Sequence, residues 1–284
     1  MTDAQNSGPQ GQPQDSTDRT AAQDLVGRGA IVTGSSRGIG AETARLLAAR
    51  GAGVVVNYRQ KAPRANKVVA AIQEAGGRAV AVGGDITTAE GRQAMVDAAL
   101  QEFGSLDLLV LNASGGMESS MGEDYAMVLN RDSQVAMLEA ALPHLSPGSQ
   151  VVFVTSHQAH FIDSVPTMDA YTPVAQSKRA GEVALRDRIP ELRDRGIGFV
   201  VVSGDMIEGT ITATMLNRAE PGAIEARREA AGKLYSVEEF AAEIVQLVGR
   251  NDLPVGYTEY VGGAEDFLRA AGGDPDAASP ADPA

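Results

Sequence analysis

Few side chains in this sequence can exchange a proton near neutral pH. The 284 residues include three histidines, six tyrosines and no cysteine. Without cysteine the chain has no disulfides, thiolate nucleophiles or sulfur-ligated metals, and we expect no metal site. Ser156, His157 and His160 follow an apolar run that ends at Thr155. Because ligands of open α/β sheets bind at the carboxyl ends of strands, we expect these three residues to contact substrate. A packing role for each histidine is the alternative.

A glycine-rich segment follows the first β-rich run. Gly34 permits a tight turn, Gly38 lets the backbone approach a pyrophosphate, and Gly40 lets the next helix pack on the strand. The N-terminus of that helix offers N–H groups and the positive end of its dipole to phosphates. The alternative is a glycine-rich turn without a ligand. The segment predicts a dinucleotide site formed by Gly34, Ser35, Ser36, Arg37, Gly38, Ile39 and Gly40.

The second β-rich run ends in Asn57-Tyr58-Arg59, without an acidic residue. A site for NAD places an acid there to bind the ribose hydroxyls, whereas a site for NADP places a base for the 2′-phosphate. Arg59 and Arg37 could clamp that phosphate with bidentate hydrogen bonds. Each arginine alone could be a solvated surface charge. Together they favour NADP(H), and we expect Asn57, Tyr58 and Arg59 to contact it.

Seven short, nearly continuous apolar runs alternate with helical patterns along the chain. Such runs are typical of strands that are covered on both faces of a parallel sheet. The runs span residues 30–33, 53–57, 79–82, 106–112, 151–155, 198–202 and 257–261. The alternation predicts an α/β fold, a single-domain, Rossmann-like, doubly wound parallel sheet of about seven strands with helices on both faces.

We expect this domain to span residues 25–269. Residues 1–24 and 270–284 are poor in large apolar side chains and predict a disordered N-terminal arm and a disordered C-terminal tail. Each carries a net charge of −3, so the −13 of the whole chain leaves −7 for the domain. This acidity argues against nucleic acid as a partner, because nucleic acid is bound mainly through Lys and Arg. No apolar run approaches the ~20 residues of a membrane span, and the first residues lack the pattern of a secretory signal. We therefore expect a cytoplasmic protein that acts on a small molecule.

The pattern Gly-x-x-x-Gly-x-Gly resembles the short-chain dehydrogenase/reductase family, and further landmarks follow in the order of that family. Asp85-Ile86 resembles its adenine-contacting pair, and the segment 111–115 resembles its Asn-Asn-Ala-Gly motif. Asn130 matches its active-site Asn, and Ser156 matches its catalytic Ser. The resemblance also implies a dimer or tetramer that forms through the helices after the fourth and fifth strands. The further cofactor contacts that it implies are Asp85, Ile86, Asn112, Ala113, Ser114, Lys178 and Gly204.

The Tyr-x-x-x-Lys motif of the family is broken in this sequence. In the family the Lys lowers the pKa of the Tyr and binds the nicotinamide ribose, while the Tyr protonates the substrate oxygen. Lys178 fits the Lys, but Val174, four residues earlier, cannot donate a proton. Because Pro173 fits the first position of a helix with Thr172 as its N-cap, we expect Tyr171 to precede the helix. Tyr171 is then either a displaced proton donor or a residue that packs at the edge of the pocket.

Two segments, 155–161 and 171–181, resemble an atypical actinomycete branch of the family. The resemblance implies NADPH-dependent reduction of a ketone on a polycyclic aromatic polyketide of the angucyclinone type, in antibiotic biosynthesis. The proton would then come from His157, from Tyr171, or from a substrate phenol that is hydrogen-bonded to the carbonyl. A non-catalytic NADP(H)-binding sensor or regulator and an ordinary dehydrogenase that uses Tyr171 remain the alternatives.

The segment 206–236 is expected to form the substrate lid. Met206, Ile207 and Met215, together with Val174, would supply a soft apolar wall that suits a flat ligand. The alternative is that these residues only pack a pair of helices against the body of the domain.

Overall fold

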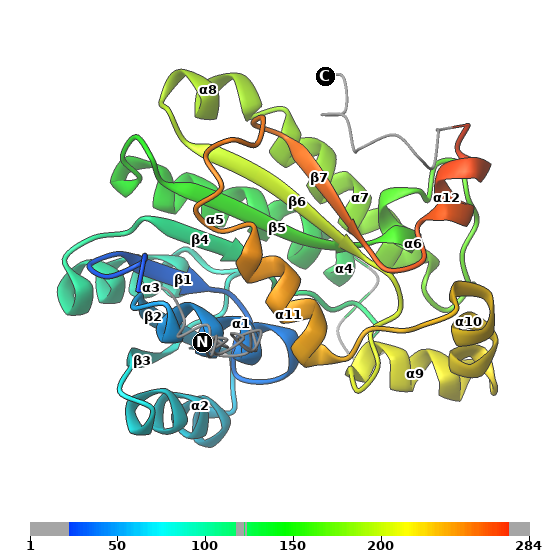
Figure 1. Ribbon diagram of the computed structural model, residues 1–284, viewed down its shortest axis with the longest axis horizontal. Coiled ribbons are helices and arrows are strands. Elements are labelled where there is room, and N and C mark those ends of the chain that lie inside the picture. The colour runs from blue at the N-terminus through cyan, green and yellow to red at the C-terminus, as the bar shows by residue number, and fades with distance from the viewer. Residues whose placement is uncertain (1–22, 118–121, 123, 273–284) are drawn as a thin grey trace, which may run out of the picture.

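The computed structural model describes residues 23–117, 122 and 124–272. Within these ranges seven strands form a single parallel sheet in the order β3-β2-β1-β4-β5-β6-β7 (Figure 1). The predicted strands are confirmed, with ends that differ by up to two residues. Their bounds are β1 Gly29–Val32, β2 Gly53–Tyr58, β3 Arg78–Gly83, β4 Leu108–Leu111, β5 Gln150–Ser156, β6 Gly198–Gly204 and β7 Tyr257–Val261.

The inner strands are rich in buried apolar residues, valine above all, because both faces of the sheet are covered. Val54, Val55 and Val56 of β2, for example, are fully buried. Val32 of β1 pairs with Val56 of β2 on one side and with Val110 of β4 on the other. The chain reverses its direction of travel across the sheet between β1 and β4. Such a switch point opens a crevice at the carboxyl ends of the strands, where ligands of this fold class bind.

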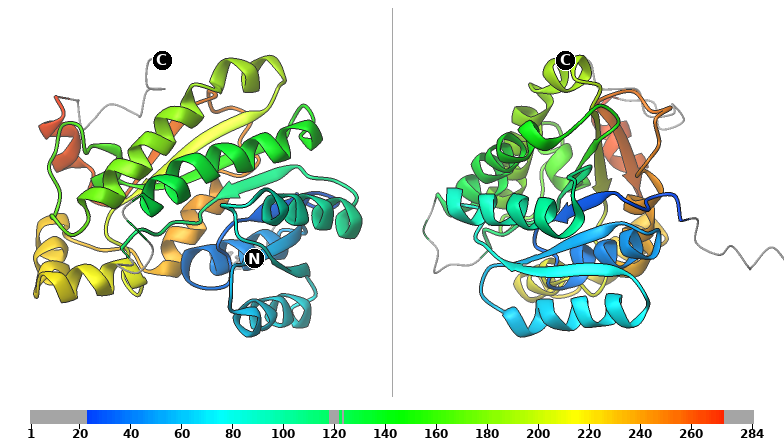
Figure 2. Two further views of the ribbon diagram at one scale, coloured as in Figure 1. Left: turned by 180° about the vertical axis from the view of Figure 1, so that it is seen from behind. Right: turned by 90° about the vertical axis from the view of Figure 1, so that its left-hand side faces the viewer.

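Helices cover both faces of the sheet (Figure 2). α1, α2 and α11 pack on one apolar core, and α3, α5 and α7 pack on the other. The bounds of these helices are α1 Gly38–Ala49, α2 Ala62–Glu74, α3 Ala89–Phe103, α5 Ser133–Ala141, α7 Thr172–Arg186 and α11 Val237–Gln246. The single-domain, doubly wound architecture predicted from the alternating pattern is thus confirmed.

The shorter elements flank the carboxyl edge of the sheet or join the main helices. Two of them, α9 and α10, lie between β6 and α11, within the predicted lid segment. Among the described residues, no helix combines the length and the hydrophobicity needed to cross a bilayer. The bounds are α4 Tyr125–Met127, the π-helical η1 Val128–Asp132, the 3₁₀-helical η2 Leu142–His144, α6 His157–His160, α8 Ile189–Asp194, α9 Ile211–Ala219, α10 Ala223–Ala231 and α12 Glu265–Ala270.

The predicted arm and tail fall mainly outside the described residues. Asp24, the last residue of the predicted arm, forms an ion pair with Arg50 after α1. Ala270, the first residue of the predicted tail, is the last residue of α12. The described residues thus include a few positions on either side of 25–269.

Candidate active site

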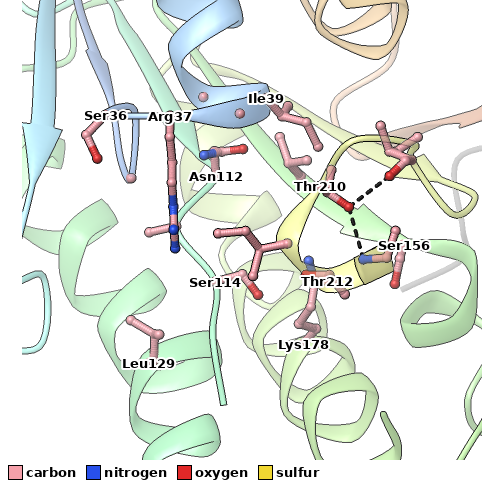
Figure 3. A pocket seen from close by; sticks show the side chains of 18 of the residues that line it. Ser36, Arg37, Ile39, Asn112, Ser114, Leu129, Ser156, Lys178, Thr210 and Thr212 are labelled. Carbon is pink, nitrogen blue, oxygen red and sulfur yellow. Dashed lines mark hydrogen bonds between the residues drawn. The ribbon is translucent and has the colours of Figure 1, made fainter. Parts of the chain in front are cut away.

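A cavity of about 620 Å³ lies at the carboxyl ends of the strands, on both sides of the switch point. It extends from the glycine-rich loop after β1 to the end of β5 and to α9. Figure 3 shows Ser36 and Arg37 at one end of the cavity, and Ser156 and Lys178 at the other. The sequence-predicted residues that line it are Gly34, Ser36, Arg37, Gly38, Ile39, Gly40, Asn57, Tyr58, Arg59, Asp85, Ile86, Asn112, Ala113, Ser114, Ser156, Tyr171, Lys178, Met206 and Ile207.

The glycines of the loop have the geometry that a phosphate cradle requires. Gly34 and Gly38 have φ of 65° and 56°, in the left-handed region that favours glycine. A Cβ on Gly38 would meet no atom within 4 Å, so the backbone there is open to a ligand. A Cβ on Gly40 would lie 2.5 Å from Nδ2 of Asn112, so only glycine lets α1 approach β4 this closely. The Arg37 side chain does not cap α1, which leaves its first N–H groups facing the cavity.

Asn57 and Ser35 support the loop from within. Oδ1 of Asn57 accepts a hydrogen bond from the Gly34 N–H at 3.0 Å, and its Nδ2 donates to the Gly84 carbonyl at 2.9 Å. The Ser35 hydroxyl donates to the Val32 carbonyl at 2.6 Å and accepts from the Asn57 N–H at 2.9 Å. Ser35 is completely buried and does not line the cavity. The structure thus corrects the expectation that Ser35 contacts the cofactor, because its hydroxyl holds the loop instead.

Four cationic side chains line the end of the cavity that lies beside β2. Arg37 and Arg59 were predicted, and they are joined by Lys61, the N-cap residue of α2, and by Arg64 in its first turn. Arg59 donates a hydrogen bond to the Tyr125 hydroxyl, and its guanidinium carbon lies 5.8 Å from the centre of that ring. Lys61 and Arg64 were missed by sequence reasoning, although their position directly after Arg59 was a signal. This cluster can hold a dianion.

Ser156, Tyr171 and Lys178 meet at the other end of the cavity. The Ser156 and Tyr171 hydroxyl oxygens lie 3.1 Å apart, and Ser156 also accepts a hydrogen bond from the Ala159 N–H at 3.3 Å. α7 begins at Thr172, so Tyr171 precedes the helix as predicted, although it rather than Thr172 is the N-cap residue. Its phenol ring nevertheless reaches the end of β5. Tyr171 is therefore a residue of the cavity, with a hydroxyl placed beside that of Ser156.

Burial changes the acid–base properties of both titratable groups at this end. It lowers the pKa of Lys178 to about 8, an effect that the negative charge of Glu182 partly offsets. It raises the pKa of Tyr171, against the smaller opposing effect of the hydrogen bond with Ser156. At neutral pH the phenol therefore keeps its proton and the ammonium keeps its charge. Together these groups can donate hydrogen bonds to an oxygen on which negative charge develops.

Asn130 lies on the π-helical turn η1, behind the cavity wall. Its Nδ2 donates to the Gly115 carbonyl at 2.8 Å and to the Ser177 hydroxyl at 2.9 Å, and its Oδ1 accepts from the Gly115 N–H at 3.3 Å. These bonds tie the segment after β4 to α7, on which Lys178 lies. Asn130 is a positioning residue here, because its side chain is engaged by protein groups and does not line the cavity.

Both predicted substrate-contacting histidines are turned away from the cavity. His157 is completely buried, and its Nε2 donates to the Gly262 carbonyl at 2.9 Å. Its Nδ1 therefore accepts from the Ser203 hydroxyl at 2.8 Å, and desolvation lowers the pKa of His157 to about 4. Nδ1 of His160 lies 2.9 Å from Oε1 of Glu182. The structure corrects both expectations, because α6 turns these rings toward β6, β7 and α7.

Three further predicted contacts also lie outside the cavity lining. Val174 is 3% exposed and packs in an apolar cluster with Tyr171 and Met206. Gly204 provides room for a neighbour, since a Cβ there would lie 2.5 Å from the Phe240 ring. Met215 lies on α9, but the residues of this helix that face the cavity are others. Sequence position placed each residue near the site, but it showed neither the direction of the Val174 and Met215 side chains nor the packing of Phe240 against Gly204.

The half of the cavity beside Ser156 is lined mainly by neutral side chains. Sequence reasoning missed its polar members: Gln158 on α6, Asp205 after β6, and Thr210 and Thr212 at the start of α9. The Thr210 hydroxyl accepts from the Ala213 N–H at 3.1 Å and so caps α9, as Figure 3 shows. The apolar members, contributed by α9 and by the segment that follows β6, include Met206, Ile207, Ile211, Ala213 and Leu216. This half suits a neutral, largely apolar ligand.

Comparison with known proteins agrees with this geometry. The family model for short chain dehydrogenases matches residues 28–221. The chain is 36% identical over 197 residues to an uncharacterized oxidoreductase of Methylorubrum extorquens, a match that covers 66% of this chain and 77% of that protein. It is 33% identical over 204 residues to versicolorin reductase 1 of Dothistroma septosporum, covering 70% and 76% of the two chains. A solved short chain dehydrogenase from Burkholderia cenocepacia, in complex with NADP, aligns with a TM-score of 0.72 and 29% identity, over 84% of this chain and 98% of that one.

Proposed function

Because the chain belongs to the short-chain dehydrogenase family of oxidoreductases, we propose that it is an NADPH-dependent ketoreductase. The proposed substrate is a ketone on a polycyclic aromatic polyketide of the angucyclinone type, and the proposed setting is antibiotic biosynthesis. The observation that carries the proposal is the meeting of the Ser156 and Tyr171 hydroxyls, 3.1 Å apart, with Lys178 at one end of a dinucleotide-sized cavity.

The choice of NADP(H) is supported at the opposite end of the cavity. The open backbone at Gly38 and the uncapped N–H groups of α1 fit a pyrophosphate. Arg37, Arg59, Lys61 and Arg64 fit a 2′-phosphate, for which a site selective for NAD would have an acid. The relative from Burkholderia cenocepacia was solved with NADP. When bound, the reduced nicotinamide supplies the hydride that reduces a carbonyl carbon.

The residues of this chain would then act on the carbonyl oxygen. Hydride addition leaves negative charge there, and the Ser156 and Tyr171 hydroxyls can donate hydrogen bonds to it. The Lys178 ammonium would anchor the nicotinamide ribose and add positive charge nearby. Asn130 would keep α7 in register with the segment after β4, and thereby hold Lys178 in place.

We propose that the substrate itself supplies the proton. Val174 occupies the position of the usual family Tyr and has nothing to donate. A phenol that is hydrogen-bonded to the adjacent carbonyl, as aromatic polyketides carry, can transfer its proton as the hydride arrives. The second candidate is Tyr171, which its distance from Ser156 favours as a displaced general acid.

The substrate class rests on two observations. The segments 155–161 and 171–181 resemble the angucyclinone ketoreductase of the simocyclinone pathway. The wall formed by Met206, Ile207 and Leu216 offers the soft apolar surface that a flat ring system needs. The similarity to a versicolorin reductase is consistent with a ring-bearing substrate.

Oxidation of NADPH, followed by its absorbance in the presence of aromatic polyketide ketones, tests the function. We expect turnover with NADPH well above that with NADH. NADPH binding without turnover of any ketone would instead indicate a sensor or regulator.

Two changes distinguish the candidate proton donors: methylation of the substrate phenol, and the substitution Tyr171→Phe. If the substrate donates, methylation of its phenol abolishes turnover and Tyr171→Phe retains most of it. If Tyr171 donates, Tyr171→Phe loses about 10²–10⁴-fold in kcat, the usual contribution of a general acid, and the methylated substrate is still reduced.

A further inference from the structure

A buried ion pair joins the α9–α10 segment to the carboxyl edge of the sheet. Asp205 follows β6 directly, lines the active-site cavity, and has a side chain that is 1% exposed. Nε of Arg227 on α10 lies 2.8 and 2.9 Å from the two Asp205 carboxylate oxygens, and its Nη2 lies 2.8 Å from Oδ2. This two-pronged geometry is the strong form of an Arg–carboxylate pair.

Arg227 has two further partners, both beyond β7. Its Nη2 donates to the Gly263 carbonyl at 2.6 Å, and its guanidinium carbon lies 4.9 Å from the centre of the Phe267 ring on α12. Figure 1 accordingly shows α10 beside α12. The guanidinium therefore connects α10 both to Asp205 at the end of β6 and to the segment that follows β7.

Apolar packing gives α10 little other attachment. The helix contains no buried residue, and only Ile224 and Ala231 pack in part against the apolar cluster under it. Its second arginine, Arg228, pairs with Glu208 at the surface, where the two side chains are 46% and 38% exposed. A surface pair of this kind contributes little, whereas a buried carboxylate that loses its partner is strongly unfavourable.

The neighbouring helix α9 covers the end of the cavity at which we place the substrate. Ile211, Thr212, Ala213 and Leu216 of α9 line that end. The two ends of the segment are fastened to each other, because the Glu208 N–H donates to the Tyr235 carbonyl at 2.9 Å. α9 is also held by Ala213 and Leu216, which are buried in the apolar cluster under it. A displacement of α9 and α10 together from the sheet would have to break the Arg227–Asp205 pair as well.

We propose that Arg227 is a positioning residue for the substrate: through Asp205 it holds α9 closed over the cavity. The part of this inference that concerns substrate rests on the proposed reductase function. The part that concerns the position of α9 does not. Loss of the pair should raise KM for the ketone about tenfold or more, because a buried charge loses its partner, and should change kcat much less.

The first test needs no substrate or cofactor. Amide hydrogen exchange is compared over residues 211–219 in the wild type, Arg227→Met and Arg227→Lys, with Arg228→Met as the matched control on the same helix. Lysine keeps the charge but cannot make the two-pronged pair and also reach Gly263. We expect exchange to increase in the order wild type, Lys variant, Met variant, with the control like the wild type and the sheet unchanged.

Two results of the exchange experiment would overturn the proposal. In the first, the amides of residues 211–219 exchange at the same rate in both Arg227 variants as in the Arg228→Met control. The other is faster exchange throughout the sheet, which would give Arg227 a role in overall stability instead.

The second test is the kinetic split between KM and kcat for the same variants. A raised KM with nearly unchanged kcat supports the substrate role, whereas a fall in kcat alone contradicts it. If neither the wild type nor any variant reduces a ketone, the proposed function is wrong. The exchange experiment still decides whether Arg227 holds α9 in position.

Discussion

At the scale of single residues, the cavity joins groups that differ from the usual set of the family at one decisive position. In the proposed assignment Val174 takes the place of the family tyrosine, and it is buried, while the Tyr171 hydroxyl reaches Ser156 from the residue before α7. Lys178, with a pKa lowered to about 8 by burial, remains charged at neutral pH. In the proposed reaction the chain therefore supplies hydrogen bonds and positive charge, and the proton comes from the substrate or from Tyr171.

His157 gives a prediction that concerns stability. Burial lowers its pKa in the folded state to about 4, whereas an unfolded chain would have the ordinary value of 6.5. Between these values the unfolded state binds more protons, so the free energy of unfolding falls as the pH falls. Thermodynamic linkage gives a loss of about 2 kcal/mol between pH 7 and pH 5 from this residue.

Denaturant unfolding at several pH values checks this prediction. His157→Gln should show a shallower decline from pH 7 to pH 5 than the wild type, although it is less stable at pH 7. His144→Gln, at an exposed position, is the control and should follow the wild type. Parallel profiles for His157→Gln and the wild type would contradict the assignment of a buried neutral imidazole.

At the scale of elements, the sequence predicted the strands and the glycine-rich loop, which depend on local pattern. It did not predict the directions in which side chains point from short elements. The valine runs of β2 and β6 predicted buried strands, and the glycines at 34, 38 and 40 predicted the loop that leads into α1. The periodic pattern did not show that α6, only four residues long, turns His157 and His160 toward β6 and β7. The sequence placed Tyr171 at the pocket but did not show that its hydroxyl lies 3.1 Å from that of Ser156, because the two residues are 15 positions apart in the chain.

The contact between α7 and η1 gives a prediction at this scale. A Cβ on Gly181 would lie 2.0 Å from the Asn130 carbonyl oxygen, so the two helical segments touch through backbone. Gly181→Ala should therefore push α7 outward, destabilise the fold by about 1–3 kcal/mol as overpacking does, and lower turnover by displacing Lys178 and Tyr171.

Thermal unfolding and kinetics of the same variant measure both effects. Gln176→Ala changes an exposed position of the same helix, outside the cavity lining, and is the control that should change neither. An unchanged melting temperature for Gly181→Ala would mean that α7 does not pack on η1 as closely as described.

At the scale of the whole molecule, the cavity combines a cationic region, which suits a phosphate, with a largely neutral and apolar region, which suits an uncharged ligand. The side beside β2 presents four cations and the open loop, and the side beside β6 presents neutral and apolar groups from α9. The groups to which we assign the reaction, Ser156 on β5, Tyr171 before α7 and Lys178 on α7, line the same cavity. The net charge of −13 contributes little to either region, since the sequence segments 1–24 and 270–284 carry −6 of it. Binding is governed by this local separation of charge within the cavity.

The surface of the molecule gives the last prediction, which concerns assembly. Among the described residues, Val128 on η1 and Val183 on α7 are exposed large apolar side chains, at 38% and 45%, on elements that pack against each other. These are the helices after β4 and β5 through which the family resemblance implies a dimer or tetramer.

We expect sedimentation equilibrium to show such an oligomer, and Val183→Glu to shift it toward monomer, because an unpaired charge would then be buried in the interface. Val26→Glu places the same charge on the other strongly exposed valine, at 67%, and should leave the oligomer intact. Equal effects of the two substitutions would exclude the α7 surface as the interface, and a monomeric wild type would exclude the assembly itself.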